Sequence, residues 1–171
     1  MSWMELKVIN KDGDVLTAEE YKNAWGGAAF IWDALCKRYD VKDKYGYHSF
    51  DAWNILWNKV RDKEINLRPF EHNVLYFTYD NALVRKEDME LLAKSLRLFD
   101  EEHKYQFRVN HCLAIADTID KYTNDNDVCG LGLYATSVGD DPWTEFNEKD
   151  KYNYYNINKG DKHWFIEMIQ F

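Results

Sequence analysis

Three aspartates stand where a hydrolase could hold a metal ion. Asp140 and Asp141 are adjacent, and Asp80 follows a predicted strand elsewhere in the chain. Carboxylates that converge from two strand ends can bind a divalent cation, which activates a water or polarises a phosphoryl oxygen. Asp-Asp-Pro is also ordinary turn chemistry. These residues therefore define the alternative hypothesis, a metal-assisted hydrolase that uses an aspartate and histidine cluster.

The other residues with catalytic side chains lack the spacing of known motifs. The five histidines are scattered, and none belongs to an HxH, HExxH or Hx3H arrangement. His111 and Cys112 are neighbours, but adjacent residues of a helix point about 100° apart, which argues against a thiol nucleophile with its base. GxGxxG, Walker A and GxSxG motifs are absent. The favoured hypothesis therefore has no catalytic residue and no cofactor.

The last third of the chain combines aromatic and acidic residues. Large rings that carry a polar group are enriched at interface hot spots, and carboxylates beside them can bind lysines and arginines through ion pairs and cation–π contacts. The same rings also fill the cores of small α+β proteins. We expect a partner-binding surface formed by Trp143, Glu145, Phe146, Glu148, Asp150, Tyr152, Tyr154 and Tyr155.

The charge of the chain is negative and unevenly distributed. There are 22 basic and 30 acidic residues, a formal net charge of −8, and after position 122 nine acids accompany four lysines and no arginine. A surface of this sign repels phosphates, so we expect no direct contact with nucleic acid. The expected partner is a basic protein surface, for example on a nucleic-acid-binding complex. A purely solubilising role would explain the same charge.

Length and composition indicate a single globular domain over residues 1–171. A chain of this size buries roughly two-thirds of its unfolded surface. Cys36, Cys112 and Cys129 are an odd number of thiols at wide spacing, which is typical of a reducing cytosol. The first residues lack the regions of a signal peptide, and no apolar run reaches the roughly 18 residues of a membrane span. We therefore expect a cytoplasmic protein with no membrane partner.

The first half of the chain is predicted to contain a strand, then helices, then a second strand. A strand is predicted over 5–9 and a turn over 11–14. Thr17 and Glu20 have the spacing of a capping box, which predicts that a helix begins there. Further helices are predicted over 28–39 and 50–62 from apolar residues at helical spacing. Residues 74–79 are predicted as a strand because their composition is rich in β-forming residues.

In the second half, helices are predicted over 86–102 and 109–122 and a strand over 128–138. Gly130 and Gly132 share one face of that strand, which predicts that an aromatic ring from Trp143 or the C-terminal segment, or another backbone, lies against it. Residues 143–149 are predicted as an acidic loop or short helix. The last twenty residues predict a hairpin, with its loop at 158–161, that lies inside a sheet and offers an edge for self-association.

These elements predict an α+β fold, with a largely antiparallel sheet of about four to five strands and four to five helices packed mainly on one face. The favoured function is a non-enzymatic acidic protein-binding module that inhibits a basic or nucleic-acid-handling protein. Phage and mobile-element anti-defence proteins, such as anti-CRISPR and anti-restriction proteins, and toxin-immunity proteins share this character. The final residues GDKHWFIEMIQF are similar to the apolar last strand of ArdA-type anti-restriction DNA mimics.

Overall fold

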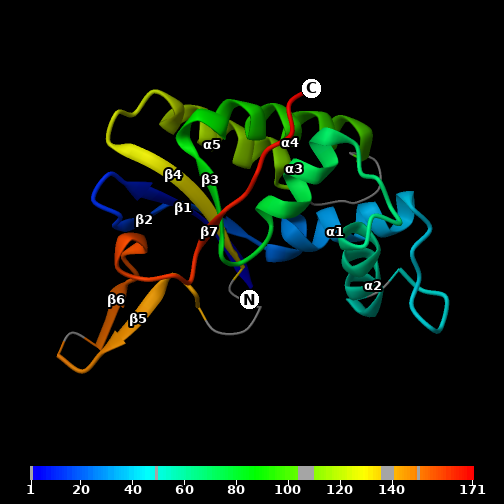
Figure 1. Ribbon diagram of the computed structural model, residues 1–171, viewed down its shortest axis with the longest axis horizontal. Helices are drawn as coiled ribbons and strands as arrows, with labels where there is room; N and C mark the ends of the chain where they lie inside the picture. Colours follow the sequence, from blue (N-terminus) through cyan, green and yellow to red (C-terminus); the bar gives the residue numbers. More distant parts are fainter. Residues whose placement is uncertain (1, 49, 104–109, 136–140, 150) are drawn as a thin grey trace.

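The structure, a computed structural model, describes residues 2–48, 50–103, 110–135, 141–149 and 151–171, with the backbone alone at 146–147 and 151–154. Within this part of the chain, five α-helices and a mixed five-stranded sheet form an α+β fold, which confirms the predicted class (Figure 1). The strand order is β2-β1-β4-β3-β7. All neighbouring strands are antiparallel except β3 and β7, which are parallel.

The main sheet contains β1 (Trp3–Asn10), β2 (Val15–Lys22), β3 (Ala82–Arg85), β4 (Val128–Ala135) and β7 (Trp164–Phe165), and a separate antiparallel pair contains β5 (Thr144–Asn147) and β6 (Lys151–Tyr154). The helices are α1 (Ala28–Arg38), α2 (Phe50–Arg61), α3 (Pro69–Phe77), α4 (Met89–His103) and α5 (Cys112–Thr123). Single 3-10 turns form η1 (Ala24–Gly26), η2 (Lys86–Asp88) and η3 (Ile157–Lys159).

The helices cover one face of the sheet. Alternate residues of each strand point to this face and to the opposite one. Met4, Leu6 and Val8 of β1 belong to the large core that the helices complete. The opposite face carries a smaller cluster that includes Ile9 of β1 and Trp143. Figure 1 shows α4 and α5 over the sheet, α1 and α2 beside one end of it, and the β5–β6 pair near the other end.

Strand β2 stands where the capping-box spacing predicted a helix, so that prediction is wrong. The strand pairs with β1 in register from Trp3 opposite Lys22 to Ile9 opposite Val15. Thr17 uses its hydroxyl across the sheet: it accepts from Lys7 Nζ at 2.9 Å and donates to Glu5 at 3.1 Å. Because pairing along the whole strand satisfies far more backbone than one cap, the tertiary context overrides the local motif.

The predicted strand over 74–79 is also wrong, because most of it belongs to α3. Pro69 occupies the first turn of this helix, where its fixed φ suits the helix and its missing N–H is not needed. The carboxylate of Glu71 accepts a hydrogen bond from the backbone N–H of Arg68 at 2.9 Å, which closes the same turn. The strand next along the chain is β3, which the sequence analysis missed.

The predicted C-terminal hairpin does not form, because its two arms join different sheets. β6 pairs with β5, which replaces the loop or short helix predicted at 143–149. β7 pairs with β3, and Trp164 N donates to Asn81 O at 3.1 Å. Trp164 is 42% exposed and lies in the edge strand β7, so the arm is not inside the sheet as predicted, and self-association through this edge stays a prediction.

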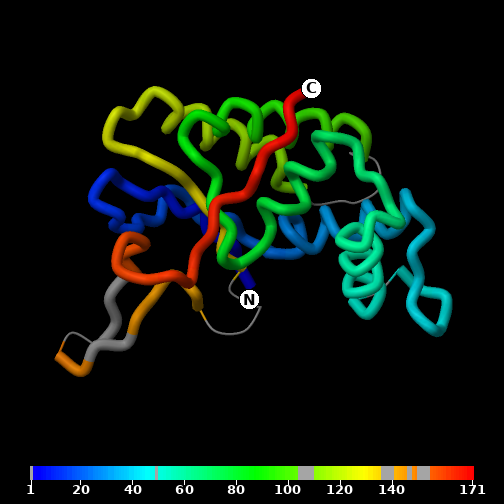
Figure 2. Tube along the Cα trace, viewed as in Figure 1, coloured from blue at the N-terminus to red at the C-terminus, as the bar shows by residue number. Residues whose placement is uncertain are grey.

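Beyond β7, the chain runs past α3 and is held there by a buried side chain (Figure 2). Asn73 of α3 is fully buried, and its amide binds both backbone groups of Ile169. Ile169 N donates to Asn73 Oδ1 at 2.8 Å, and Asn73 Nδ2 donates to Ile169 O at 3.0 Å. The C-terminal segment is therefore fastened to α3, and Ile166 between these two points is buried in the core.

Candidate functional site

The structure divides the predicted partner-binding surface. Glu145 and Glu148 are exposed, but the rings of Trp143 and Tyr155 are 0% and 3% exposed. These two rings cannot meet a partner, so their predicted role is corrected: they fill the interior. Asp150 lies outside the described residues, as do the side chains of Phe146, Tyr152 and Tyr154.

Trp143 is buried because it lies against the glycine face of β4. A Cβ atom added to Gly132 would stand 2.3 Å from the Trp143 ring, a distance that only glycine tolerates. This contact confirms the prediction that a ring packs on the glycine stripe. The ring of His163 also contacts Trp143, with its centroid 4.4 Å from that of Trp143 and 5.1 Å from that of Tyr155. The three rings thus attach the β5–β6 region to the sheet.

The predicted metal site is brought together only in part. Asp80 and Asp141 line one polar pocket of about 520 Å³ together with Tyr79, Asn81, Pro142, Lys162 and Trp164. Asp141 Oδ1 accepts the backbone N–H of Trp143 at 2.8 Å, as in an ordinary turn. Asp140 lies outside the described residues. Among the residues with described placement, no three His, Cys, Asp or Glu side chains form a group suited to a metal ion.

A second cavity, the aromatic cleft, adjoins this polar pocket. Its volume is about 300 Å³, and Tyr79 and Asp80 line both cavities. The cleft lies between η1, α1, α2 and the segment that follows α3. Its walls are mainly rings and methyl groups, contributed by Ala24, Trp25, Ala28, Ala29, Trp32, Phe50, Trp53, Asn54, Thr78, Tyr79, Asp80 and Ala135. A volume at the lower end of ligand pockets suits one side chain or a small molecule.

Hydrogen bonds fix the two inner indole rings of the aromatic cleft. Trp32 Nε1 donates to Thr78 Oγ1 at 2.8 Å, and the Thr78 hydroxyl in turn donates to Leu75 O at 2.6 Å. Trp53 Nε1 donates to Asp33 Oδ1 at 2.8 Å. The polar ends of both indoles are thus satisfied by the protein, which leaves their apolar surfaces for the cleft.

Ring contacts continue from the inner wall to the mouth of the cleft. The centroid of Trp32 lies 6.1 Å from that of Trp53 and 6.0 Å from that of Tyr79. Phe50 contacts Trp53 with centroids 4.5 Å apart. Phe50 is 58% exposed and Trp25 is 60% exposed, so both project into solvent at the mouth. Two large exposed rings beside a cavity mark a binding surface more clearly than scattered apolar residues do.

Asp80 is the charged residue that the two cavities share. It is partly buried, and no residue within the described ranges donates a hydrogen bond or forms an ion pair with its carboxylate. Burial raises the pKa of this carboxyl above its ordinary value. A carboxylate that loses water without gaining a partner destabilises the fold, and a cation bound beside it would offset that cost.

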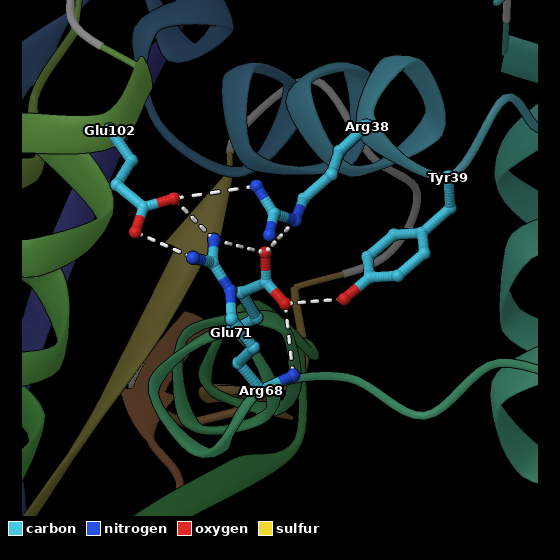
Figure 3. Close-up of polar contacts among 5 residues, drawn as sticks. All are labelled: Arg38, Tyr39, Arg68, Glu71 and Glu102. Carbon is cyan, nitrogen blue, oxygen red and sulfur yellow. Dashed lines mark hydrogen bonds and ion pairs between the residues drawn. The ribbon is translucent and has the colours of Figure 1, made fainter.

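The charged cluster around Glu71 contrasts with Asp80 (Figure 3). The Glu71 side chain is 0% exposed, and it pairs with Arg38 at 2.9 Å and with Arg68 at 2.7 Å. Tyr39 donates its hydroxyl hydrogen to Glu71 Oε2 at 2.6 Å, and Glu102 of α4 pairs with both arginines. Burial opposes ionisation of Glu71, but the bonds from Arg68 and Tyr39 outweigh it and lower its pKa. The cluster joins α1, α3 and α4 and has a structural role.

No sequence pattern predicted the residues that form the aromatic cleft. Phe50 and Trp53 were assigned only to the apolar stripe of a helix, and Trp25 preceded two glycines with no motif of its own. The sequence feature that could have indicated these residues is an excess of aromatic rings on a short helix and at the start of a helix. That signal does not tell which rings face the core and which face a cavity.

Comparisons of this chain with protein-family models, with curated proteins and with solved structures gave no match in any of the three. Across the part of the chain that the structure describes, every helix is too short or too polar to cross a membrane. The aromatic cleft and the charge of its surroundings are therefore the features of this chain that bear on its function.

Proposed function

We propose that the protein is a non-enzymatic protein-binding module that holds a basic segment of a partner protein in the aromatic cleft. The observation that carries this proposal is Asp80, a partly buried carboxylate without a partner among the described residues, at the wall that the cleft shares with the polar pocket. A lysine or arginine of the partner supplies the missing positive charge.

The walls of the cleft support a cationic occupant. Aromatic faces attract a cation through their quadrupole, and this attraction is strongest where water is excluded. Trp32, Trp53 and Tyr79 provide such rings in the cleft, and Asp80 provides the counter-charge. The net charge of −8 favours encounter with basic surfaces before any specific contact forms.

A module of this kind acts by occupying a basic surface. Basic surfaces of nucleic-acid-handling proteins bind phosphates, so a protein that covers the same lysines and arginines competes with the nucleic acid. An inhibitor of such a protein, including one that acts against a cellular defence system, is the biological role that we propose.

Titration with a lysine- and arginine-rich decapeptide tests this proposal through tryptophan fluorescence and calorimetry. We expect Asp80→Asn to weaken binding about tenfold, the size of one lost ion pair. Asp12→Asn removes an equal charge from the β1–β2 turn, outside the cleft, and serves as the matched control. Affinity should fall as salt rises.

The opposite effects of these substitutions on peptide binding would place the binding surface outside the aromatic cleft. If Asp80→Asn binds like the unchanged protein, while Glu145→Lys and Glu148→Lys abolish binding, the acidic segment binds the partner and the cleft does not. If the unchanged protein shows no affinity for the basic peptide, the proposed function is wrong.

A metal-assisted hydrolase is the second candidate, because Asp80 and Asp141 line the same pocket. In that case Mg²⁺ or Mn²⁺ should raise the melting temperature of the protein, and Asp141→Asn should remove the effect. An unchanged melting temperature over millimolar concentrations of both ions would exclude this candidate.

A further inference from the structure

The aromatic cleft offers few hydrogen-bond acceptors for a cation. A lysine ammonium has three N–H donors and an arginine guanidinium has five. Asp80 is the charged acceptor among the residues that line the cleft, Asn54 and Tyr79 each add one neutral side-chain oxygen, and the hydroxyl of Thr78 is already bonded to Trp32 and Leu75. Most of the remaining wall consists of ring surfaces and alanine methyl groups. A cation with many donors would therefore lose hydration that the cleft does not replace.

The Glu71 cluster shows what this protein uses when it does bind guanidinium groups. There, the guanidinium of Arg68 pairs with the carboxylate of Glu71 at 2.7 Å and with that of Glu102. Arg38 pairs with the same two carboxylates. Two carboxylates surround each guanidinium, which matches its fork of donors. The aromatic cleft has one carboxylate and several rings, so its chemistry suits a different cation.

We propose that the aromatic cleft recognises the quaternary ammonium group of a trimethylated lysine in a basic segment of the partner. This proposal rests on the proposed function and names the chemical class of the ligand. A trimethylammonium group donates no hydrogen bond, is weakly hydrated and carries its charge over methyl groups, which pack against ring faces. Asp80 balances the charge without needing to be a hydrogen-bond acceptor.

A protein side chain is favoured over a free quaternary amine by the mouth of the cleft. Trp25 and Phe50 are 60% and 58% exposed, so they extend the aromatic surface beyond the cavity itself. A small free amine would fill the interior and leave these rings in water. The residues on either side of a trimethyllysine would cover them and gain contact area.

Three decapeptides that differ at one central position test the proposal. This position carries lysine, trimethyllysine or arginine, and each peptide is titrated into the full chain under identical salt. We expect the trimethyllysine peptide to bind about tenfold more tightly than the lysine peptide and more tightly than the arginine peptide. Choline serves as the free quaternary amine and should bind more weakly than the trimethyllysine peptide.

Two substitutions test whether the preference for trimethyllysine arises in the aromatic cleft. Trp25→Ala removes an exposed ring at the mouth and should reduce the preference for trimethyllysine to about twofold or less. Tyr45→Ala removes a ring that is 70% exposed in the loop between α1 and α2 and does not line the cleft, so the preference should stay at about tenfold. Circular dichroism of both variants confirms that they are folded.

The outcomes separate this proposal from the proposed function. If all three peptides bind equally, or arginine binds best, the methyl-lysine proposal is overturned and the binding of basic segments stands. If choline binds as tightly as the trimethyllysine peptide, the occupant is a free amine and the protein-borne ligand is overturned. If no peptide binds, both proposals fall.

Discussion

Glu71 and Asp80 are carboxylates at opposite ends of α3 with opposite surroundings. Glu71 in the first turn is fully buried and receives bonds from Arg38, Arg68 and Tyr39. Asp80, just beyond the last turn, is partly buried and has no partner among the residues that the structure describes. The pKa of Glu71 is lowered and that of Asp80 is raised. One charge supports the fold, and the other opposes it.

The difference indicates how a buried carboxylate can be recognised as structural or functional. A buried charge with all its bonds made joins elements and offers nothing to a ligand. A desolvated charge with no bonds, in the wall of a cavity, can be stabilised only by something that the chain does not supply. Substitutions at the two ends of α3 should therefore have opposite effects on stability and on binding.

The largest expected effect is the loss of stability in Glu71→Gln. The amide cannot satisfy two guanidinium groups, so we expect the free energy of unfolding to fall by about 3 kcal/mol. This value is at the low end for a broken buried pair because Arg38 and Arg68 keep 36% and 31% of their side chains exposed. Urea unfolding measures it, and Glu90→Gln on the exposed face of α4 is the control.

The stability that Glu71 contributes should also depend on pH. Its folded-state pKa lies below the ordinary value of 4.5, so this stability is complete above that pH and is lost as the pH falls through the lowered pKa. The Glu71→Gln variant should lack this component of the acid response. A variant that retains the full stability and acid response of the unchanged protein would contradict the structural role of the cluster.

A smaller loss is expected for Tyr39→Phe. This change removes the one hydroxyl that bonds to Glu71 Oε2 and leaves the ring in place. A bond to a charged group contributes about 1.5 kcal/mol, so the free energy of unfolding should fall by that amount. Tyr45→Phe, at an exposed loop position, should change it by less than about 0.5 kcal/mol.

The smallest expected effect has the opposite sign and occurs in Asp80→Asn. Because the folded-state pKa is raised, Asp80 contributes stability below its ordinary value of 3.8 and loses it as the pH rises through the raised pKa. The variant avoids this loss, so at pH 7 it should be equally stable or more stable by up to about 1 kcal/mol. Asp12→Asn should leave the melting temperature unchanged. A clear destabilisation would show that Asp80 has a structural partner.

Several parts of the fold could be predicted because they depend on local patterns. The apolar stripe of Met89, Leu92, Leu96 and Phe99 predicts α4, and all four side chains are fully buried. The glycine pair of β4 predicts a ring against the sheet, which is Trp143 on Gly132. These features are decided by residues close together in the chain or by the absence of a side chain.

The errors arose where a distant strand or helix competed with a local signal. Thr17 and Glu20 have capping-box spacing, yet pairing with β1 makes them part of β2. The two C-terminal segments with alternating residues resemble one hairpin. In the structure the first of them, β6, pairs with β5, and the second, β7, pairs with β3. The residues of a strand do not specify which other strand it pairs with. Its pairing depends on which strand edges the rest of the fold leaves open.

The residues alone thus determine the α+β class, the amphipathic helices, the acidic charge and the lack of known catalytic motifs. Only the tertiary structure decided that Trp143 and Tyr155 are interior, that Trp25 and Phe50 are at the surface, and that Asp80 has no partner within the described part of the chain. Whether a ring or a carboxylate is buried, paired or open depends on segments far away in the chain, and no local pattern contains that information.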